Sequence, residues 1–326
     1  MSFDVLCLRP EADFQRVGAL PPTTLRVTYR AATDADVPAL MKEARSLVIP
    51  AVGPKLPANL FAESTVKFVQ VTGAGLDRLD LQFLKQRGVV VANVAGGSNE
   101  AVADYAVTTA SVLLRRFSWA DAEIRKANYR DFRARMIADS LLGLDGLLVG
   151  VVGFGIIGLS VATAFHKRGC SILFHDPAPR DPRAGEALRA KPCSLEELLR
   201  TADVVSLHVP LLPQTTGLIG TQELAMMKPE AVLIQASRGG VVSEAALVQA
   251  LQNGQLGGVA VDVYSTEPPA ADNPLLALQG EAASRILFTP HIAGVTRQST
   301  AFLCRAAWRN VERFFAGDEA LQYVVS

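Results

Sequence analysis

This sequence has none of the features that direct a chain to a membrane or a nucleic acid. No stretch approaches the roughly 18 apolar residues that a membrane-spanning helix needs, and the apolar run near the N-terminus is too short for a signal peptide. Lysine plus arginine and aspartate plus glutamate number 32 each, so the net charge is zero. An electrostatic reason to bind nucleic acid or an anionic membrane is therefore missing. We expect a cytoplasmic protein with neither nucleic acid nor membrane as a partner.

Cysteine and histidine are scarce. The four cysteines, Cys7, Cys170, Cys193 and Cys304, are scattered, and no two form a CxxC pair. Cys7 and Cys170 lie in strand-like apolar runs, where a thiol is usually a small core residue. This usage predicts no metal site and no disulfide, and it is typical of a reducing compartment. The chain also has only four histidines, so few residues are candidates for histidine chemistry.

The chain does have length and alternating apolar segments. Its 326 residues, 49% hydrophobic and 20% charged, are typical of a globular protein with room for two domains. In the first hundred residues, short runs rich in valine, leucine and isoleucine alternate with helix-like segments such as 34–44 and 76–88. The strand-like runs are 4–9, 25–30, 46–51, 67–73 and 89–94. Such alternation predicts an α/β fold with a parallel sheet wrapped by helices.

A long helical stretch separates this series from a second one. Residues 99–129 have the composition and apolar periodicity of a long helix, a break near Phe117-Ser118 and another helix. Further strands are predicted at 147–152, 171–175, 203–208, 231–235, 258–262 and 286–288. The charged segment 176–187 is interpreted as a surface loop.

The second series opens with the glycine pattern Gly153-x-Gly155-x-x-Gly158. The pattern follows the apolar strand LLVGVV and precedes the helix-like IIGLSVATAFHKRG, a context that makes a weak motif informative. Gly153 permits a tight turn, Gly155 lets a pyrophosphate approach the backbone, and Gly158 lets the helix pack closely on the strand. The following helix N-terminus offers free N–H groups to phosphate. These residues predict a dinucleotide site; a glycine turn in a nucleotide-free α/β domain is the alternative.

Asp176 follows the next predicted strand. A carboxylate there can accept hydrogen bonds from the adenosine ribose hydroxyls and would repel a 2′-phosphate. The cofactor is therefore predicted to be NAD, with NADP less favoured. Arg180 and Arg183 lie nearby and weaken this inference, because either could pair with such a phosphate.

Three stretches place ionisable residues directly after predicted strands, where ligands of open α/β sheets bind. They are AVLIQASRGG with Arg238, GVAVDVYSTEPP with Asp262 and Glu267, and ILFTPHIAG with His291. A carboxylate beside a histidine holds one tautomer and stabilises the imidazolium, which suits a proton donor near neutral pH. An arginine can grip a carboxylate and polarise an adjacent carbonyl. Hydride transfer to a 2-oxo acid requires these same functions. His291 alone would more often be a structural histidine in a turn, and it is the combination that favours the catalytic interpretation.

The chain resembles the D-isomer-specific 2-hydroxyacid dehydrogenases over nearly its whole length. The resemblance rests on eight stretches in the family's order: TGAGLDRLD (72–80), NEAVADYAV (99–107), GVVGFGIIG (150–158), HDP (175–177), HVPLLPQTTGLI (208–219), MMKPEAVLIQASRGG (226–240), DVYSTEPP (262–269) and TPHIAG (289–294). It implies a Rossmann-type domain, 101–294, inserted into a flavodoxin-like substrate domain, 1–100 and 295–326, with a cleft that closes on the substrate. A homodimer is a further expectation from the family.

The resemblance also implies the roles of individual residues. Arg238, Glu267 and His291 would form the catalytic triad, with His291 as acid/base, Glu267 as its partner and Arg238 binding and polarising the substrate. The backbone amides of Ala74 and Gly75 would hold the substrate carboxylate. Positions matching the family's NAD contacts are Gly153, Gly155, Ile156, Ile157, Gly158, Asp176, Val209, Pro210, Thr215, Ala236, Ser237, Arg238, Asp262, His291 and Gly294.

Some residues depart from the family pattern. Asp104 stands where the family usually has glutamate, and Gln235 where asparagine is common. The loop PAVGPKLP carries Pro50 where several relatives have arginine, and its only base is Lys55, which favours a small unphosphorylated acid over phosphoglycerate.

The predicted activity is NAD(H)-dependent reduction of glyoxylate, hydroxypyruvate, pyruvate or a similar 2-oxo acid to the D-hydroxy acid. A phosphonate (phosphite) dehydrogenase and a non-catalytic NAD-sensing protein of the corepressor type are the alternatives.

Overall fold

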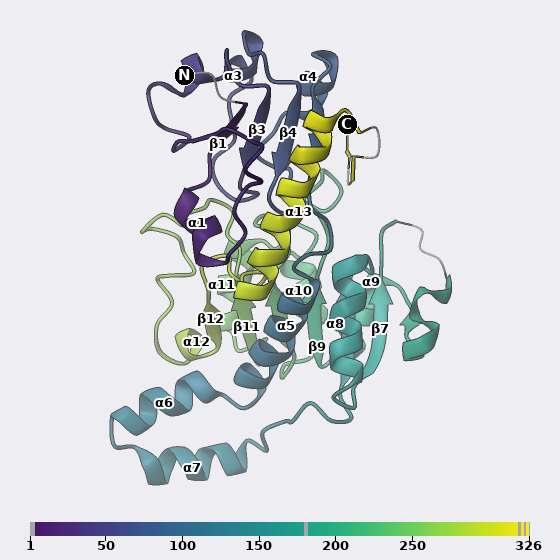
Figure 1. Cartoon of the computed structure of the whole chain (residues 1–326). Coiled ribbons are helices and arrows are strands. Elements are labelled where there is room, and N and C mark those ends of the chain that lie inside the picture. The colour runs from purple at the N-terminus through teal and green to yellow at the C-terminus, as the bar shows by residue number, and fades with distance from the viewer. Residues whose placement is uncertain (1–3, 179–181, 319–320, 323, 326) are drawn as a thin grey trace. The chain divides into compact units, whose positions relative to one another are not determined.

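The structure, a computed structural model, describes residues 4–178, 182–318, 321–322 and 324–325. The chain divides into two compact units, Met1–Ser98 with Val295–Ser326, and Asn99–Gly294. Each unit is an α/β layer structure with one parallel sheet, and Figure 1 labels many of their elements. The α/β fold predicted from the alternating apolar runs is confirmed.

The first unit contains a five-stranded parallel sheet in the order β2-β1-β3-β4-β5. Its strands are β1 (Val5–Cys7), β2 (Val27–Tyr29), β3 (Ser46–Ile49), β4 (Phe68–Val71) and β5 (Val90–Ala92). Its helices are α1 (Glu11–Arg16), α2 (Val37–Leu40), α3 (Asn59–Ala62), α4 (Leu81–Gln86) and α13 (Arg297–Ala316). This strand order is the flavodoxin-like one, in agreement with the predicted fold.

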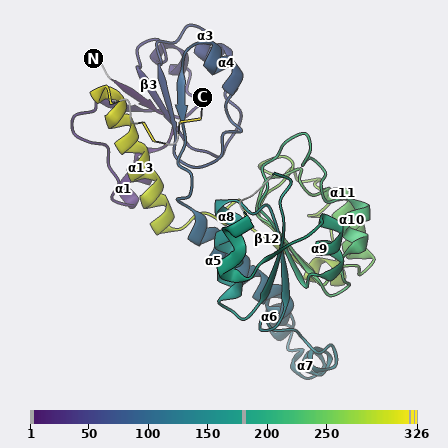
Figure 2. The ribbon, with the colours of Figure 1, turned by 90° about the vertical axis from the view of Figure 1, so that its right-hand side faces the viewer.

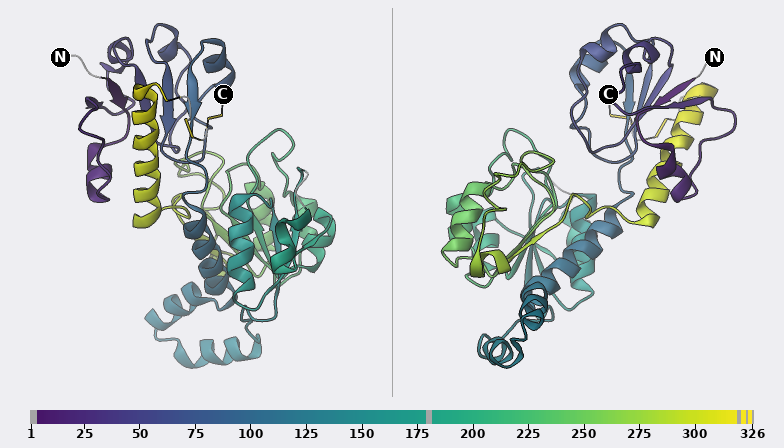
Figure 3. Two further views of the ribbon diagram at one scale, coloured as in Figure 1. Left: turned by 45° about the vertical axis from the view of Figure 1, so that its right-hand side comes forward. Right: turned by 90° about the vertical axis from the view of Figure 1, so that its left-hand side faces the viewer.

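Alternate strand residues pack on opposite faces of this sheet. Leu6, Leu47 and Val69 join the core covered by α2, α3 and α4. Val5 and Phe68 join the core covered by α1 and α13. The helix α13 therefore covers one face of a sheet whose strands all come from the first hundred residues, and both views in Figure 3 show it beside these strands.

The second unit contains a seven-stranded parallel sheet in the order β12-β11-β10-β9-β6-β7-β8. The strands are β6 (Leu148–Val152), β7 (Ser171–His175), β8 (Lys191–Pro192), β9 (Val204–Leu207), β10 (Val232–Gln235), β11 (Gly258–Val261) and β12 (Ile286–Phe288). This is the Rossmann order with one further strand at its edge.

Helices cover both faces of this sheet. One face packs on α5 (Asn99–Leu114) and α8 (Ile156–His166), and the other on α9 (Leu195–Thr201), α10 (Thr221–Met226) and α11 (Glu244–Gln252). Figure 2 shows the strands between these two helical layers. The unit also contains α12 (Gly280–Ser284) and the 3₁₀ turn η1 (Pro182–Leu188), which lies in the segment interpreted as a loop.

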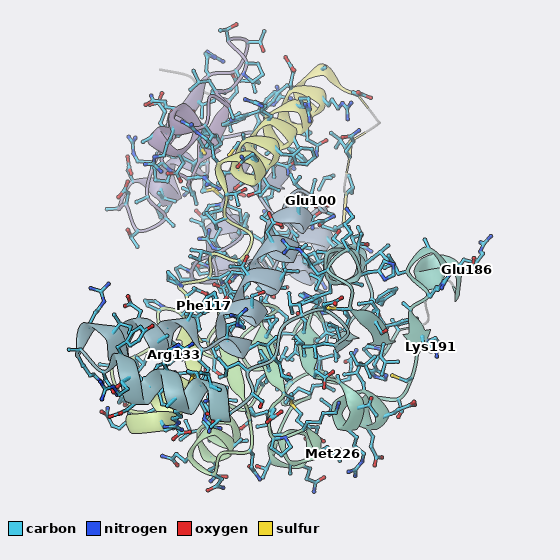
Figure 4. All side chains as sticks on the ribbon, turned by 90° about the horizontal axis from the view of Figure 1, so that it is seen from below. Glu100, Phe117, Arg133, Glu186, Lys191 and Met226 are labelled. Carbon is cyan, nitrogen blue, oxygen red and sulfur yellow. The ribbon has the colours of Figure 1, made fainter. Side chains whose placement is uncertain are left out.

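The helical stretch after residue 99 has the predicted long helix, break and second helix, and then a third helix that was not predicted. The long helix ends at Leu114, and Arg116 adopts a left-handed conformation with φ 50° before α6 (Phe117–Arg125) begins. A third helix, α7 (Tyr129–Ala138), follows where the prediction had ended. The Trp119 ring packs edge-on against the Phe132 ring, with 5.3 Å between the ring centroids, and this contact joins α6 and α7 into a hairpin. Figure 4 marks the two helices by Phe117 and Arg133.

The described helices include none that is long and apolar enough to cross a bilayer.

Candidate active site

The glycine turn joins β6 to α8 in a conformation that only glycine allows. Gly153 has φ +91°, and a Cβ there would lie 2.6 Å from the carbonyl oxygen of His208. A Cβ on Gly158 would lie 1.9 Å from the carbonyl oxygen of Gly153. Both positions therefore lack space for a side chain, because their neighbours are backbone.

The N-terminus of α8 is open to a ligand. The N–H groups of Ile156 and Ile157 donate to no acceptor among the described residues, as expected for the first turn of a helix. Such groups bind phosphate, and Gly155, the residue directly before them, has no side chain to block its approach. The residues present therefore fit the pyrophosphate of a dinucleotide.

Asp176 lies at the end of β7 and is tied to this turn. Its Oδ2 accepts a hydrogen bond from the Phe154 N–H at 2.6 Å, and its Oδ1 accepts one from the Ala178 N–H at 2.9 Å. A carboxylate at the end of this strand is the group that accepts hydrogen bonds from ribose hydroxyls in dinucleotide-binding folds. Arg183 is exposed, and Arg180 lies outside the described residues.

The loop after β9 lies against the glycine turn. A Cβ on Gly153 would also meet the Val209 side chain at 2.9 Å. The Thr215 hydroxyl donates to the Pro210 carbonyl at 2.6 Å and accepts from the Leu212 N–H at 2.8 Å. Thr215 is buried, and in this structure its hydroxyl holds the loop in shape.

His208, at the start of that loop, has a hydrogen bond between its Nε2 and the Ser206 hydroxyl at 2.7 Å. Burial lowers the pKa of His208 from 6.5 to about 4, because removal from water disfavours the charged ring. Between these two pH values the unfolded chain binds a proton that the folded chain does not. The free energy of unfolding should therefore fall as the pH drops from 6.5 toward 4.

We expect His208→Asn to reduce this acid sensitivity. The parent should lose at most about 3 kcal/mol between pH 7 and pH 4 through this one group, and the variant should lose less. Urea unfolding at several pH values measures the difference. His166→Asn, at an exposed position on α8, is the control and should follow the parent. Parallel curves for parent and His208→Asn would contradict the prediction.

The loop after β10 is held by Gln235. The Gln235 Nε2 donates to the Arg238 carbonyl at 2.7 Å, and its Oε1 accepts from the Ser237 hydroxyl at 2.8 Å. The Arg238 Nη1 donates to the Ser237 carbonyl at 2.7 Å. Gln235 is buried and therefore fixes the backbone that carries Arg238. This departure from the family pattern retains an amide that bridges the turn.

Glu267 and His291 form a pair. His291 Nδ1 and Glu267 Oε2 are 2.8 Å apart, and the second carboxylate oxygen accepts from the Tyr264 N–H at 3.1 Å. Both side chains are about one quarter exposed, at 27% and 28%. The His291 Nε2 contacts no described hydrogen-bond partner. With Nδ1 on the carboxylate, Nε2 is the ring atom that can exchange a proton with a ligand.

Asp262 positions the histidine loop. Its carboxylate, 1% exposed, accepts from the N–H groups of Ile292 at 2.8 Å and Ala293 at 2.9 Å, and from the Thr289 hydroxyl at 2.6 Å. Its carbonyl accepts from the His291 N–H at 2.8 Å. These bonds hold His291 at φ 55°, a conformation uncommon outside glycine. Asp262 therefore fixes the conformation of the loop that carries His291 and ends at Gly294.

Sequence reasoning missed the further members of this network. The Tyr105 hydroxyl is 2.8 Å from that of Thr289, and the Tyr264 hydroxyl donates to the Thr289 carbonyl at 3.0 Å. Thr289 belongs to the TPHIAG stretch, two residues before His291, so the sequence could have indicated that it supports the histidine loop. Tyr105 is 184 residues away in the chain, and no local pattern indicates that contact.

The predicted substrate turn belongs to the first unit. Ala74 and Gly75 follow β4, and the Ala74 carbonyl accepts from the Asn93 side-chain amide at 2.8 Å, while the Gly73 carbonyl accepts from the Val94 N–H at 2.9 Å. The Ala74 and Gly75 N–H groups donate to no described acceptor. Successive free amides of this kind bind anions. Asn93 is a positioning residue that sequence reasoning did not identify.

Within the second unit, the loops described above share one sheet edge. The strands β6, β9, β10, β11 and β12 are parallel neighbours, so their carboxyl ends meet there. A Cβ on Gly239 would lie 1.8 Å from the Tyr264 carbonyl oxygen, so the loops after β10 and β11 are in backbone contact. The structure thus brings the Arg238 loop, the Glu267–His291 pair and the glycine turn to the carboxyl edge.

A cavity of about 320 Å³ lies at the opposite edge, beside Val232 and Gly257 at the amino ends of β10 and β11. Charged side chains that line this cavity are paired with opposite charges, Arg116 with Asp139 and Arg135 with Glu281. It is therefore a poor candidate for an anionic substrate. The described residues also contain no group of three or more His, Cys, Asp or Glu side chains that could hold a metal ion.

A Rossmann sheet with an open helix N-terminus, and a histidine–carboxylate pair at the same edge, defines the class of dinucleotide-binding dehydrogenases. Residues 107–293 match the family model of the D-isomer specific 2-hydroxyacid dehydrogenase, NAD binding domain. The chain belongs to this family.

Relatives share the family and differ in substrate. The chain is 34% identical to D-3-phosphoglycerate dehydrogenase of Archaeoglobus fulgidus, over 73% of this chain and 43% of that protein. It is 32% identical to glyoxylate reductase of Thermococcus litoralis, over 78% of this chain and 75% of that protein. The crystal structure of Aquifex aeolicus D-lactate dehydrogenase with NAD and lactic acid superposes with a TM-score of 0.81, at 27% identity and 98% coverage of both chains.

Proposed function

We propose that this protein is an NAD(H)-dependent D-2-hydroxyacid dehydrogenase that reduces a small 2-oxo acid. The observation that carries the proposal is the 2.8 Å bond between His291 and Glu267, at the sheet edge that also carries Arg238 and the glycine turn. Glyoxylate, hydroxypyruvate and pyruvate are the favoured substrates, since Lys55 is the only base in the 50–57 loop.

Each residue has a separate task in this reaction. The nicotinamide cofactor, when bound, supplies the hydride that reaches the carbonyl carbon of the substrate. The Arg238 guanidinium binds the substrate and polarises its carbonyl. His291 donates the Nε2 proton to the carbonyl oxygen, which becomes the hydroxyl, and Glu267 at Nδ1 stabilises the imidazolium beforehand. Ala74 and Gly75 hold the carboxylate through their backbone amides.

A panel of 2-oxo acids tests the proposal. Oxidation of NADH and NADPH should be followed with glyoxylate, hydroxypyruvate and pyruvate, and reduction of NAD with phosphite. Turnover of at least one oxo acid with NADH is expected. Turnover of phosphite alone would indicate a phosphonate dehydrogenase, and tight NADH binding without any turnover would indicate an NAD sensor.

Asp176 should determine the coenzyme preference. We expect the parent to bind NADH at least roughly 10-fold more tightly than NADPH, because the carboxylate repels a 2′-phosphate. Asp176→Asn keeps an oxygen for the Phe154 N–H but removes the charge, so this ratio should shrink. Fluorescence titration measures both affinities, with Asp272→Asn, at an exposed position, as the control. An unchanged ratio in Asp176→Asn would contradict the assignment.

We further propose a homodimer. The α6–α7 hairpin exposes four large apolar side chains, each 50–65% accessible: Phe117, Ile124, Tyr129 and Ile137. Exposed apolar side chains that gather on one element are a feature of protein–protein interfaces. Light scattering tests this.

A further inference from the structure

Arg78 of the first unit is a buried cation. It is 4% exposed, its Nε donates to the Pro54 carbonyl at 2.9 Å, and its Nη1 donates to the Pro50 carbonyl at 3.0 Å. A Cβ on Gly53 would lie 3.3 Å from the Arg78 Cζ, so the guanidinium packs directly against the loop backbone. Burial lowers the pKa of Arg78, yet an arginine remains charged in proteins.

In the part of the chain that the structure describes, no carboxylate pairs with Arg78. Other arginines of the same unit do have such partners: Arg9 pairs with Asp13 at 3.1 Å, and Arg26 with Asp4 at 3.0 Å. A buried charge that only carbonyl oxygens solvate is costly to keep. Its presence therefore requires an explanation beyond packing.

Arg78 joins two segments at the carboxyl edge of the sheet. Its own carbonyl accepts from the Leu56 N–H at 2.8 Å, so three hydrogen bonds tie it to residues 50–56, the loop after β3. Arg78 also lies three residues after Gly75, in the turn after β4. Because β3 and β4 are parallel neighbours, both segments emerge at the same edge.

We propose that Arg78 is a positioning residue for the substrate's carboxylate. This inference rests on the proposed function, in which the Ala74 and Gly75 amides bind that group. Arg78 fixes the 50–56 loop to the substrate turn, and its positive charge, which no described carboxylate neutralises, draws the anionic substrate to the amides. Arg78 therefore acts on the substrate in two indirect ways: it fixes the turn that carries the amides, and its charge attracts the anion electrostatically.

Steady-state kinetics of Arg78→Gln and Arg78→Lys test the inference. For the best 2-oxo acid, Arg78→Gln should raise KM about 10-fold and lower kcat far less. It should also flatten the decrease of kcat/KM with added salt, since that decrease reports attraction between charges. Arg78→Lys keeps the charge and should restore the salt dependence, while KM stays raised because the two-carbonyl grip is lost. Arg87→Gln, at an exposed position of the same unit, should match the parent.

Proteolysis tests the clamp without reference to activity. Endoproteinase Lys-C should cleave the Lys55–Leu56 bond about 10-fold faster in Arg78→Gln than in the parent, because Leu56 loses its anchor. Cleavage after Lys85, in α4, is the internal reference and should not change.

The outcomes separate the two proposals. If the parent reduces no oxo acid, the proposed function fails, and the Lys55 cleavage rate still decides whether Arg78 fixes the loop. If the parent is active but Arg78→Gln keeps its KM, its salt dependence and its cleavage rate, the inference about Arg78 is wrong. A loss of NADH affinity equal to the loss of substrate affinity would also overturn it, since the cofactor residues belong to the other unit.

Discussion

Replacing His291 by alanine will slow the reduction of the best 2-oxo acid by at least about 10²-fold, with little change in NADH affinity. In the proposed function the imidazole gives its Nε2 proton to the carbonyl oxygen, and loss of a positioned general acid typically costs 10²–10⁴-fold. The change does not alter Gly153 and Gly158, which we propose lie beside the cofactor's pyrophosphate. Single-turnover reduction separates this chemical step from NADH binding, which is measured by fluorescence titration.

Two further variants sharpen this test. Glu267→Gln keeps an oxygen near His291 Nδ1 but removes the charge that stabilises the imidazolium, so its turnover should lie between those of the parent and His291→Ala. His166→Ala replaces an exposed histidine of α8 and should behave as the parent. A His291→Ala protein that reduces its substrate as fast as the parent would show that the proton takes another route.

Gly239→Ala is expected to have an effect of similar size for a different reason. The added Cβ would lie 1.8 Å from the Tyr264 carbonyl oxygen and 2.7 Å from the Ser265 N atom, and neither backbone atom can rotate away. The loop with Arg238 must therefore separate from the loop with Glu267 by about an ångström or more. A misplacement of ~1 Å can cost about 10²-fold in rate.

The measurement for Gly239→Ala is kcat/KM for the 2-oxo acid beside the thermal midpoint of unfolding. Gly143→Ala is a matched control, because a Cβ there meets nothing within 4 Å and the residue has no positive φ. The control should keep full activity. If Gly239→Ala keeps the parent's kcat/KM, then the close contact between the two loops has no part in placing Arg238.

The sequence allowed the strands and the glycine turn to be predicted because local forces determine them. Runs such as VLC, SLVI and VLIQ are buried along their whole length, as strands in a parallel sheet must be. Gly153 and Gly158 were identifiable because their spacing reflects a backbone requirement. Position directly after predicted strands indicated that Arg238, Glu267 and His291 would lie near one another, and the family resemblance implied their separate roles.

Other parts could not be predicted, because they depend on contacts between distant segments. The Asp262 network includes Tyr105, which no local pattern connects to it. Arg78 in TGAGLDRLD could be taken for a surface arginine, since its burial depends on the carbonyls of a loop more than twenty residues earlier. The helix α7 was missed because its only buried residue is Phe132, which leaves little apolar periodicity to detect.

The way the chain returns to its first sheet has a consequence for its synthesis. The second unit is one uninterrupted stretch of chain, Asn99–Gly294, so all of its strands and helices are synthesised consecutively. The other unit lacks Cys304, Trp308 and Val311 of α13, which pack with Val5 and Phe68, until α13 has been synthesised. Until then this apolar face of the sheet is covered only in part, by α1, and we expect the nascent first unit to be the part that chaperones protect.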